Sequence, residues 1–274
     1  MTTVPDIRLH DGHALPSLGF GVYKVDDEAA VPAVAAALDA GYRLVDTATL
    51  YGNERGVGRA IRASGLAREQ VFVTTKLWND AHGDAAARAA FEASTQRLGL
   101  GAPDLYLIHW PSPARGLFVE TWRTLLALRD EGRVRSVGVS NFQPDHLARI
   151  VDDSGQAPVL NQVELHPYLQ QRELRAFHAA HGIVTQAWSP LGRGAVLRDP
   201  VLADIAAAHG VSPAQVVLRW HLDLGVAVIP KSVTPARIRE NFDVFGFALS
   251  QADHTRIAGL DRGERTGSHP DTVN

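Results

Sequence analysis

Short apolar segments alternate with longer segments of helical periodicity along almost the whole chain. The apolar segments, each typical of a buried strand, lie at 19–23, 44–48, 71–76, 105–110, 134–140, 159–165, 183–189 and 226–230. Between and after them, apolar residues recur at helical spacing over 28–40, 54–64, 85–98, 118–130, 144–152, 169–181, 213–222 and 234–242. Strands that are apolar almost throughout and alternate with helices are typical of a parallel sheet covered by helices. The pattern therefore predicts an α/β fold, a (β/α)8 (TIM) barrel.

Three further elements extend this pattern. Asp11-Gly12 stands between two short apolar segments and predicts a tight β-hairpin before the first barrel strand. Helical segments at 199–209 and 250–259 predict two extra helices outside the eight repeats. Because no linker-like or low-complexity segment interrupts the chain, we expect residues 1–274 to form a single barrel domain.

A doubly wound sheet is the competing architecture, and its usual sign is a G-x-G-x-x-G turn after the first strand. The segment GFG (19–21) lacks the third glycine and a following helix start. The segment GVG (56–58) lies within a predicted helix. Since neither segment is a dinucleotide fingerprint, the sequence favours the barrel.

Composition narrows the classes of function. The chain is 45% hydrophobic and 21% charged with a formal net charge of −3, which is typical of a globular protein. It has no basic stripe and no long apolar run, so we expect neither nucleic acid nor a membrane as a partner. The absence of cysteine excludes disulfides, thiolate ligands and cysteine nucleophiles, and we expect no metal at the site. We see no signal peptide or interface element, and expect a cytoplasmic monomer.

Polar side chains converge where the second, third and fourth predicted strands end, and the active site of a barrel lies at those ends. These residues are Asp46, Tyr51, Lys76 and His109. A phenol titrates near ~10, and a nearby ammonium lowers that pKa. We therefore expect Lys76, oriented by Asp46, to tune Tyr51 as a proton donor. His109 would hydrogen-bond a substrate oxygen on which negative charge develops.

A second group of polar residues stands further along the chain. Asn141, Gln162, Trp188 and Ser189 lie at the ends of later strands. Lys231, Ser232 and Arg237 bring two cations, a hydroxyl and a helix start together within a few residues. That combination is typical of an anion site.

Several segments together resemble the aldo-keto reductases. GYRLVDTATLYGNERGVG (41–58) is similar to the leading motif of that family, VTTKLW (73–78) to its lysine strand and LYLIHWP (105–111) to its histidine strand. VGVSNF (137–142), NQVELHPY (161–168), AWSPLG (187–192) and IPKSVTPARIRENFDVF (229–245) follow in the order of the family. The resemblance covers nearly the whole chain and is strongest to the bacterial 2,5-diketo-D-gluconate reductases.

The resemblance implies an NADPH-dependent reductase of aldehydes and ketones, including dicarbonyls and keto-sugars. Its catalytic tetrad would be Asp46, Tyr51, Lys76 and His109, with Tyr51 as the general acid. Ser140, Asn141 and Gln162 would hold the carboxamide of the cofactor, and Trp188 would stack on the nicotinamide ring. Ser189, Leu191 and Gly192 would lie along the pyrophosphate, Lys231, Ser232 and Arg237 at the 2′-phosphate, and Glu240 and Asn241 at the adenine.

The resemblance also places the substrate, a small carbonyl compound, in a pocket lined by Val22, Tyr23, Trp78 and Trp110. The chain departs from the family pattern at Thr234 and Pro235, where similar proteins often carry further basic residues. We therefore expect a less strict preference for NADPH over NADH.

Two other functions are compatible with parts of this pattern. A barrel aldolase would use Lys76 as a Schiff-base amine, although Asp46 would keep that amine charged. A redox sensor would bind NADPH and regulate a partner with little turnover, although the intact tetrad favours an enzyme. Trapping of substrate on Lys76 by borohydride would identify the aldolase, and turnover of a simple aldehyde would exclude the sensor.

Overall fold

Eight parallel strands form the centre of the computed structural model, which describes residues 4–274. They are β3 (Phe20–Gly21), β4 (Leu44–Asp46), β5 (Phe72–Leu77), β6 (Leu105–Ile108), β7 (Ser136–Ser140), β8 (Leu160–Glu164), β9 (Val184–Trp188) and β10 (Ala227–Val228). Each strand pairs with the next one in the sequence. A parallel bridge between Leu18 and Val228 joins the first strand to the last and closes the barrel. The predicted (β/α)8 fold is confirmed.

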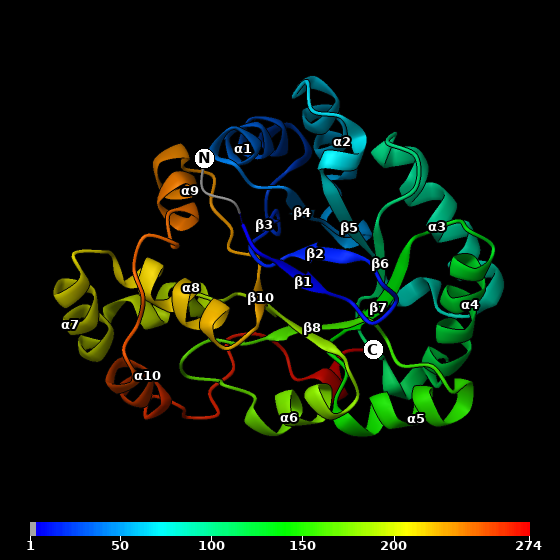
Figure 1. Ribbon diagram of the computed structural model, residues 1–274. Helices are drawn as coiled ribbons and strands as arrows, with labels where there is room; N and C mark the ends of the chain where they lie inside the picture. Colours follow the sequence, from blue (N-terminus) through cyan, green and yellow to red (C-terminus); the bar gives the residue numbers. More distant parts are fainter. Residues whose placement is uncertain (1–3) are drawn as a thin grey trace.

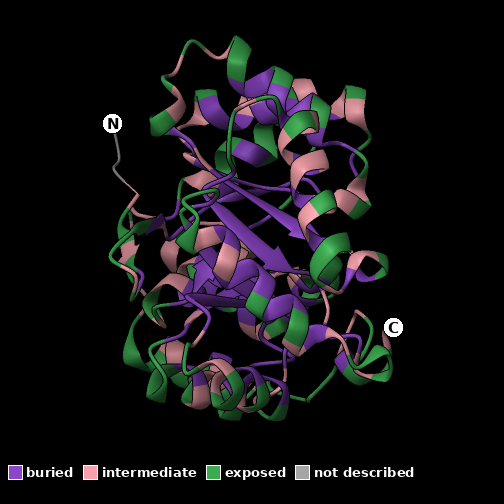
Figure 2. Cartoon of the chain, turned by 90° about the vertical axis from the view of Figure 1, so that its right-hand side faces the viewer, coloured by how far each residue is buried: buried purple, intermediate pink, exposed green. Residues whose placement is uncertain are grey.

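The helices surround the strands and bury their inner faces against them (Figures 1 and 2). They are α1 (Asp27–Ala40), α2 (Glu54–Ala63), α3 (Asp84–Leu98), α4 (Phe118–Asp130), α5 (Pro144–Ser154), α6 (Arg172–Ala180), α8 (Pro213–Asp223) and α9 (Pro235–Phe242). The two extra helices that the sequence predicts are α7 (Pro200–His209) and α10 (Gln251–Ala258). Among the described residues no single helix can cross a membrane, although α7 and α8, bent by 89°, together meet the length and composition limits.

The predicted hairpin, β1 (Asp6–Arg8) with β2 (Ala14–Pro16), covers the end of the barrel where the strands begin (Figure 1). Leu9 and Leu15 of this hairpin are fully buried against Leu44, Leu105 and Leu160, the first residues of three barrel strands. Apolar side chains therefore fill this end of the barrel, and the opposite end carries the polar residues.

Close packing between helices explains the GVG segment of α2. A Cβ atom added to Gly58 would lie 1.8 Å from the carbonyl oxygen of Leu98, at the end of α3. Only glycine permits that approach, so this residue serves helix packing and not nucleotide binding.

One helix begins later than predicted. The pattern predicts a helix from residue 169, but α6 begins at Arg172. Leu169 pairs with His166 in an antiparallel bridge, and Gln171 has a left-handed φ of 50°. This turn interrupts the helical backbone that the side-chain periodicity suggests.

Candidate active site

A buried ion pair forms the base of the site. Asp46 is the last residue of β4, and Lys76 lies on the neighbouring strand β5. Nζ of Lys76 lies 2.5 Å from Oδ1 of Asp46 and donates a second hydrogen bond to the carbonyl oxygen of Thr47 at 2.9 Å. Both side chains are almost fully buried, at 0% and 2% exposure. Such a pair needs this close geometry because both charges have lost their hydration.

The aromatic residues of the site lie above this pair. Tyr51 ends a short 3-10 turn after β4, and Nζ of Lys76 lies 5.1 Å from the centroid of its ring. The ring centroid of His109, which follows β6, is 5.7 Å from that of Tyr51 and 5.2 Å from that of Trp78. The structure therefore brings together the four residues that the sequence suggests for catalysis.

Burial dominates the ionisation of these groups. It raises the pKa of the Tyr51 phenol well above its usual value, and the carboxylate of Asp46 raises it further. The expectation that Lys76 lowers the pKa of Tyr51 is therefore wrong, because burial dominates and the pKa is raised. Burial, with a smaller contribution from Lys76, lowers the pKa of His109 well below its usual value, so its ring is neutral. Tyr51 retains its proton at neutral pH, as a proton donor must.

Burial also shifts the pKa values of the two residues of the ion pair, Asp46 and Lys76. Burial raises the pKa of Asp46 and lowers that of Lys76, while their mutual attraction opposes both shifts. A second carboxylate, Glu54 at the start of α2, also raises the pKa of Lys76. Glu54 is 1% exposed and accepts hydrogen bonds from Thr75 and Arg97, both at 2.6 Å. The sequence analysis did not single out Glu54, although it lies in the motif at 41–58.

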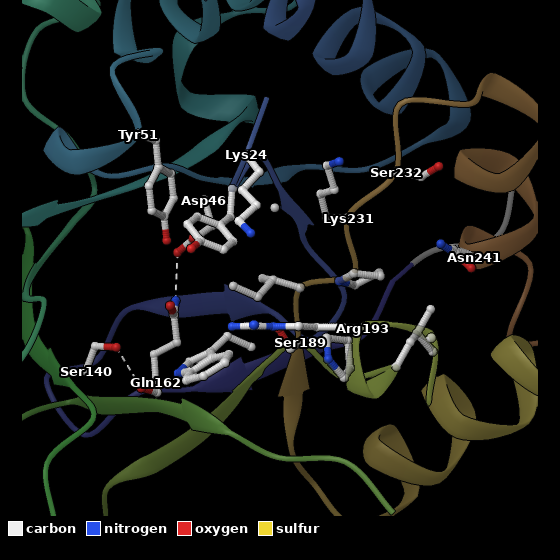
Figure 3. Close-up of a pocket in the computed structure, with 18 of the residues that line it drawn as sticks. Lys24, Asp46, Tyr51, Ser140, Gln162, Ser189, Arg193, Lys231, Ser232 and Asn241 are labelled. Atoms are coloured by element: carbon white, nitrogen blue, oxygen red, sulfur yellow. Dashed lines mark hydrogen bonds between the residues drawn. The ribbon is translucent and has the colours of Figure 1, made fainter. Parts of the chain in front are cut away.

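Amide and hydroxyl groups on β7 to β9 border the ion pair. Nε2 of Gln162 donates to Oδ2 of Asp46 and to Oε1 of Gln186, both at 2.7 Å. Ser140 donates to the carbonyl oxygen of Gln162 at 2.8 Å (Figure 3). The side-chain nitrogen of Asn141 donates to the carbonyl oxygen of His109 at 2.9 Å. These contacts connect the predicted carboxamide site directly to the predicted reaction centre.

A cavity of about 1000 Å³ extends from this reaction centre to the loop before α9. Figure 3 shows Tyr51, Asp46 and Gln162 at one end and Ser232 and Asn241 at the other. The predicted residues that line it are Tyr23, Asp46, Tyr51, Trp78, His109, Trp110, Ser140, Asn141, Gln162, Trp188, Ser189, Leu191, Lys231, Ser232, Arg237, Glu240 and Asn241.

Three predicted residues lie outside the lining. Val22 is fully buried in the hydrophobic core, because its neighbours Gly21 and Tyr23 face the cavity and side chains alternate along an extended chain. Lys76 lies beneath the cavity. Gly192 is buried behind the cavity wall, whereas its neighbour Leu191 forms part of that wall.

Several residues that line the cavity were not predicted from the sequence. Lys24, Arg193 and Arg198 add three cations to the cavity, and none pairs with a carboxylate in the described part of the chain. Leu50, Ser268 and Val273 add to the wall. Lys24, Lys76 and Lys231 are the only lysines in the sequence, so every lysine of the chain lies at this site.

Residues 17–262 match the family model described as the aldo/keto reductase family. The chain belongs to this family. The match includes every residue of the reaction centre, from Asp46 to His109.

Individual aldo/keto reductases are similar over almost their whole length. An aldo-keto reductase of Mycolicibacterium smegmatis is 55% identical over 270 residues, which are 98% of each chain. Methylglyoxal reductase DkgA of Salmonella typhimurium is 50% identical over 267 residues, 97% of this chain and 96% of that protein. A solved variant of Gox0644 in complex with NADPH is 48% identical, with a TM-score of 0.96 and full coverage of both chains.

Proposed function

We propose that this protein reduces small aldehydes and ketones, dicarbonyls such as methylglyoxal among them, with NADPH as the reductant and Tyr51 as the general acid. The observation that carries the proposal is the contact between Lys76 and Asp46 directly beside the Tyr51 ring, at the deep end of a large cavity. A protonated phenol, a neutral imidazole and a buried cation together suit a carbonyl oxygen that gains charge and then a proton. The methylglyoxal reductases at about 50% identity support dicarbonyls as substrates.

The cavity fits NADPH by the chemistry of its two ends. At the outer end Lys231 and Arg237 carry positive charge that no described carboxylate neutralises, which suits a phosphate. At the inner end the donor and acceptor groups of Gln162 and Asn141 suit a carboxamide, and Trp188 offers an aromatic face. The similar structure that was solved in complex with NADPH supports NADPH as the cofactor.

When bound, NADPH supplies the hydride that makes a carbonyl carbon into an alcohol carbon. Tyr51 holds a proton on its Oη atom and delivers it to the carbonyl oxygen, so that hydride and proton together give the alcohol. A neutral His109 carries a hydrogen on one ring nitrogen and can donate it to the same oxygen. The Lys76 ammonium stabilises the phenolate that remains, and Trp78 and Trp110 form apolar walls that exclude water.

The surroundings of Lys76 weigh against the aldolase. A Schiff-base lysine must reach the substrate as a free amine. Nζ of Lys76 instead donates to Asp46 and to the carbonyl oxygen of Thr47, and its side chain is fully buried beneath the cavity. The redox sensor remains the second candidate, because cofactor binding alone would use the same cavity.

The test is consumption of NADPH with methylglyoxal, simple aldehydes and keto-sugars, with Tyr51→Phe as the control variant. We expect steady turnover in the unmodified protein and almost none in the variant, with NADPH binding intact in both. Tight binding without turnover of any carbonyl would favour the sensor. A borohydride-trapped adduct on Lys76 would favour the aldolase.

A further inference from the structure

The end of the chain crosses the barrel mouth as a strap, which we define as residues 262–274. The amide of Glu264 donates to the carbonyl oxygen of Tyr168 at 3.0 Å, just after β8. At the other end, Oδ1 of Asn274 accepts a hydrogen bond from the amide of Ala114 at 2.9 Å, in the loop between β6 and α4. The strap is therefore tied to two separate parts of the mouth.

One buried carboxylate, which the catalytic proposal does not use, holds the strap in place. Glu164 ends β8 and is fully buried. Its Oε1 accepts from the amide and hydroxyl of Thr266, at 2.7 and 2.6 Å, and its Oε2 accepts from the amide of Gly267 at 3.1 Å. Burial opposes ionisation, but hydrogen bonds from His166, Thr266 and Gly267 outweigh it and lower the pKa of Glu164 to about 2. The Glu164 carboxylate of the folded protein is therefore charged at neutral pH.

The strap residue that Glu164 holds packs directly on Trp188. Glu164 and Trp188 are paired residues on the adjacent strands β8 and β9. A Cβ atom added to Gly267 would lie 2.4 Å from Cη2 of Trp188 and 3.1 Å from Oε2 of Glu164. The Nε1 atom of Trp188 donates to Oδ1 of Asn141 at 2.8 Å. The indole is therefore held on one side by Asn141 and on another by the backbone of the strap.

We propose that Glu164 is a positioning residue, which fixes Gly267 against Trp188 and so sets the plane of the indole that faces the cavity. The inference rests on the proposed function only in taking that indole as the surface for the nicotinamide ring. A carboxylate suits this role because it accepts several backbone and hydroxyl hydrogens at once, whereas a neutral side chain offers fewer acceptors. Gly267 is the matching part, since any side chain there would displace the indole or the strap.

The sharpest test adds one methyl group at the contact. Gly267→Ala should push the indole from its position, while Gly246→Ala is the matched control, because a Cβ there meets nothing within 4 Å. We expect the dissociation constant of NADPH to rise about tenfold in Gly267→Ala, as overpacking predicts, and to stay unchanged in the control. Equal NADPH binding in the two variants would overturn the proposal.

The anchor is tested at Glu164 by two variants. Glu164→Gln keeps one acceptor oxygen and should retain part of the NADPH affinity, whereas Glu164→Ala removes both acceptors and should lose more. Acrylamide quenching of Trp188, isolated by subtracting the fluorescence of Trp188→Phe, should increase in the same order in the free protein. If both variants leave quenching and affinity unchanged, Glu164 does not position the indole. If Glu164→Ala does not fold, Glu164→Gln and Gly267→Ala still test whether the strap positions the indole.

The quenching measurement separates this inference from the proposed function. It needs neither cofactor nor substrate, so it reports on the strap even if no carbonyl is reduced. If the indole is mobile in Gly267→Ala and the unmodified protein reduces no carbonyl compound, the strap contact is supported and the proposed function is contradicted. Normal reduction with an indole equally protected in every variant would contradict the strap contact alone.

Discussion

The two ends of the cavity hold their charges in opposite ways. At the inner end Lys76 and Asp46 are buried and pair with each other at 2.5 Å. At the outer end Lys231 and Arg237 are exposed, as is Arg193 between the two ends beside Ser189, and none pairs with a described carboxylate. The inner charges are already oriented before any ligand arrives, whereas the outer charges are free to pair with an anion. We therefore expect variants of the paired residues to change chemistry most, and variants of the unpaired cations to change cofactor affinity.

The largest effect is expected at the inner end from Tyr51→Phe, which removes only the hydroxyl. Loss of a general acid should slow carbonyl reduction by about 10²–10⁴-fold. NADPH affinity should stay close to normal, because the phenol belongs to the reaction centre and not to the phosphate end. Steady-state rates and a cofactor titration check this. Reduction at more than about a tenth of the original rate would exclude Tyr51 as the acid.

Breaking the ion pair should reduce both activity and stability. Lys76→Met leaves the Asp46 carboxylate buried without a counter-charge, which should lower the free energy of unfolding by about 3–5 kcal/mol. The double variant Lys76→Met with Asp46→Asn removes both charges and should recover much of that loss in a denaturant titration. A double variant no more stable than Lys76→Met would contradict this account of the pair.

The pH profile should move in opposite directions in the two single variants. The Asp46 carboxylate raises the pKa of Tyr51, so Asp46→Asn should lower that pKa and shift the fall of the rate at high pH to lower pH. Lys76→Met removes a cation 5.1 Å from the ring centroid, so it should shift that fall to higher pH. Rates of aldehyde reduction across the basic range measure both shifts, and two shifts of the same sign would refute the mechanism.

At the outer end, Arg237→Ala should weaken NADPH selectively. A charge-assisted contact with a phosphate contributes enough that its loss should raise the NADPH dissociation constant about tenfold or more. NADH lacks the 2′-phosphate and should bind as before. Titration with both cofactors gives the ratio. Equal weakening would mean that Arg237 stacks on the cofactor or supports the loop.

The smallest effect is expected from Arg193→Ala. This arginine follows Gly192, next to the residues expected along the pyrophosphate, and both cofactors carry that group. An exposed cation should contribute only a few-fold in affinity, equally for NADPH and NADH. The same two titrations test this. A selective loss of affinity for NADPH would indicate that Arg193 contacts the 2′-phosphate instead.

The sequence predicts the placement of residues on regular strands better than that of residues on loops, for a physical reason. Asp46 and Lys76 lie on regular strands, so periodicity and strand order are enough to bring them together. The position of Arg193 depends on left-handed backbone angles at Ser189, Gly192, Arg193 and Gly194, which no periodicity reveals. The raised pKa of Tyr51 likewise follows from burial, which only the assembled barrel defines.

The distribution of lysine has a practical consequence for covalent chemistry. Amine-directed reagents, including acylating labels and the aldehyde groups of common enzyme supports, attach to lysine side chains. Here Lys24 and Lys231 line the cavity and Lys76 lies beneath it, so no lysine side chain offers a harmless attachment point elsewhere. A lysine introduced on the hairpin at His10, which is exposed, would offer an amine at the opposite end of the barrel.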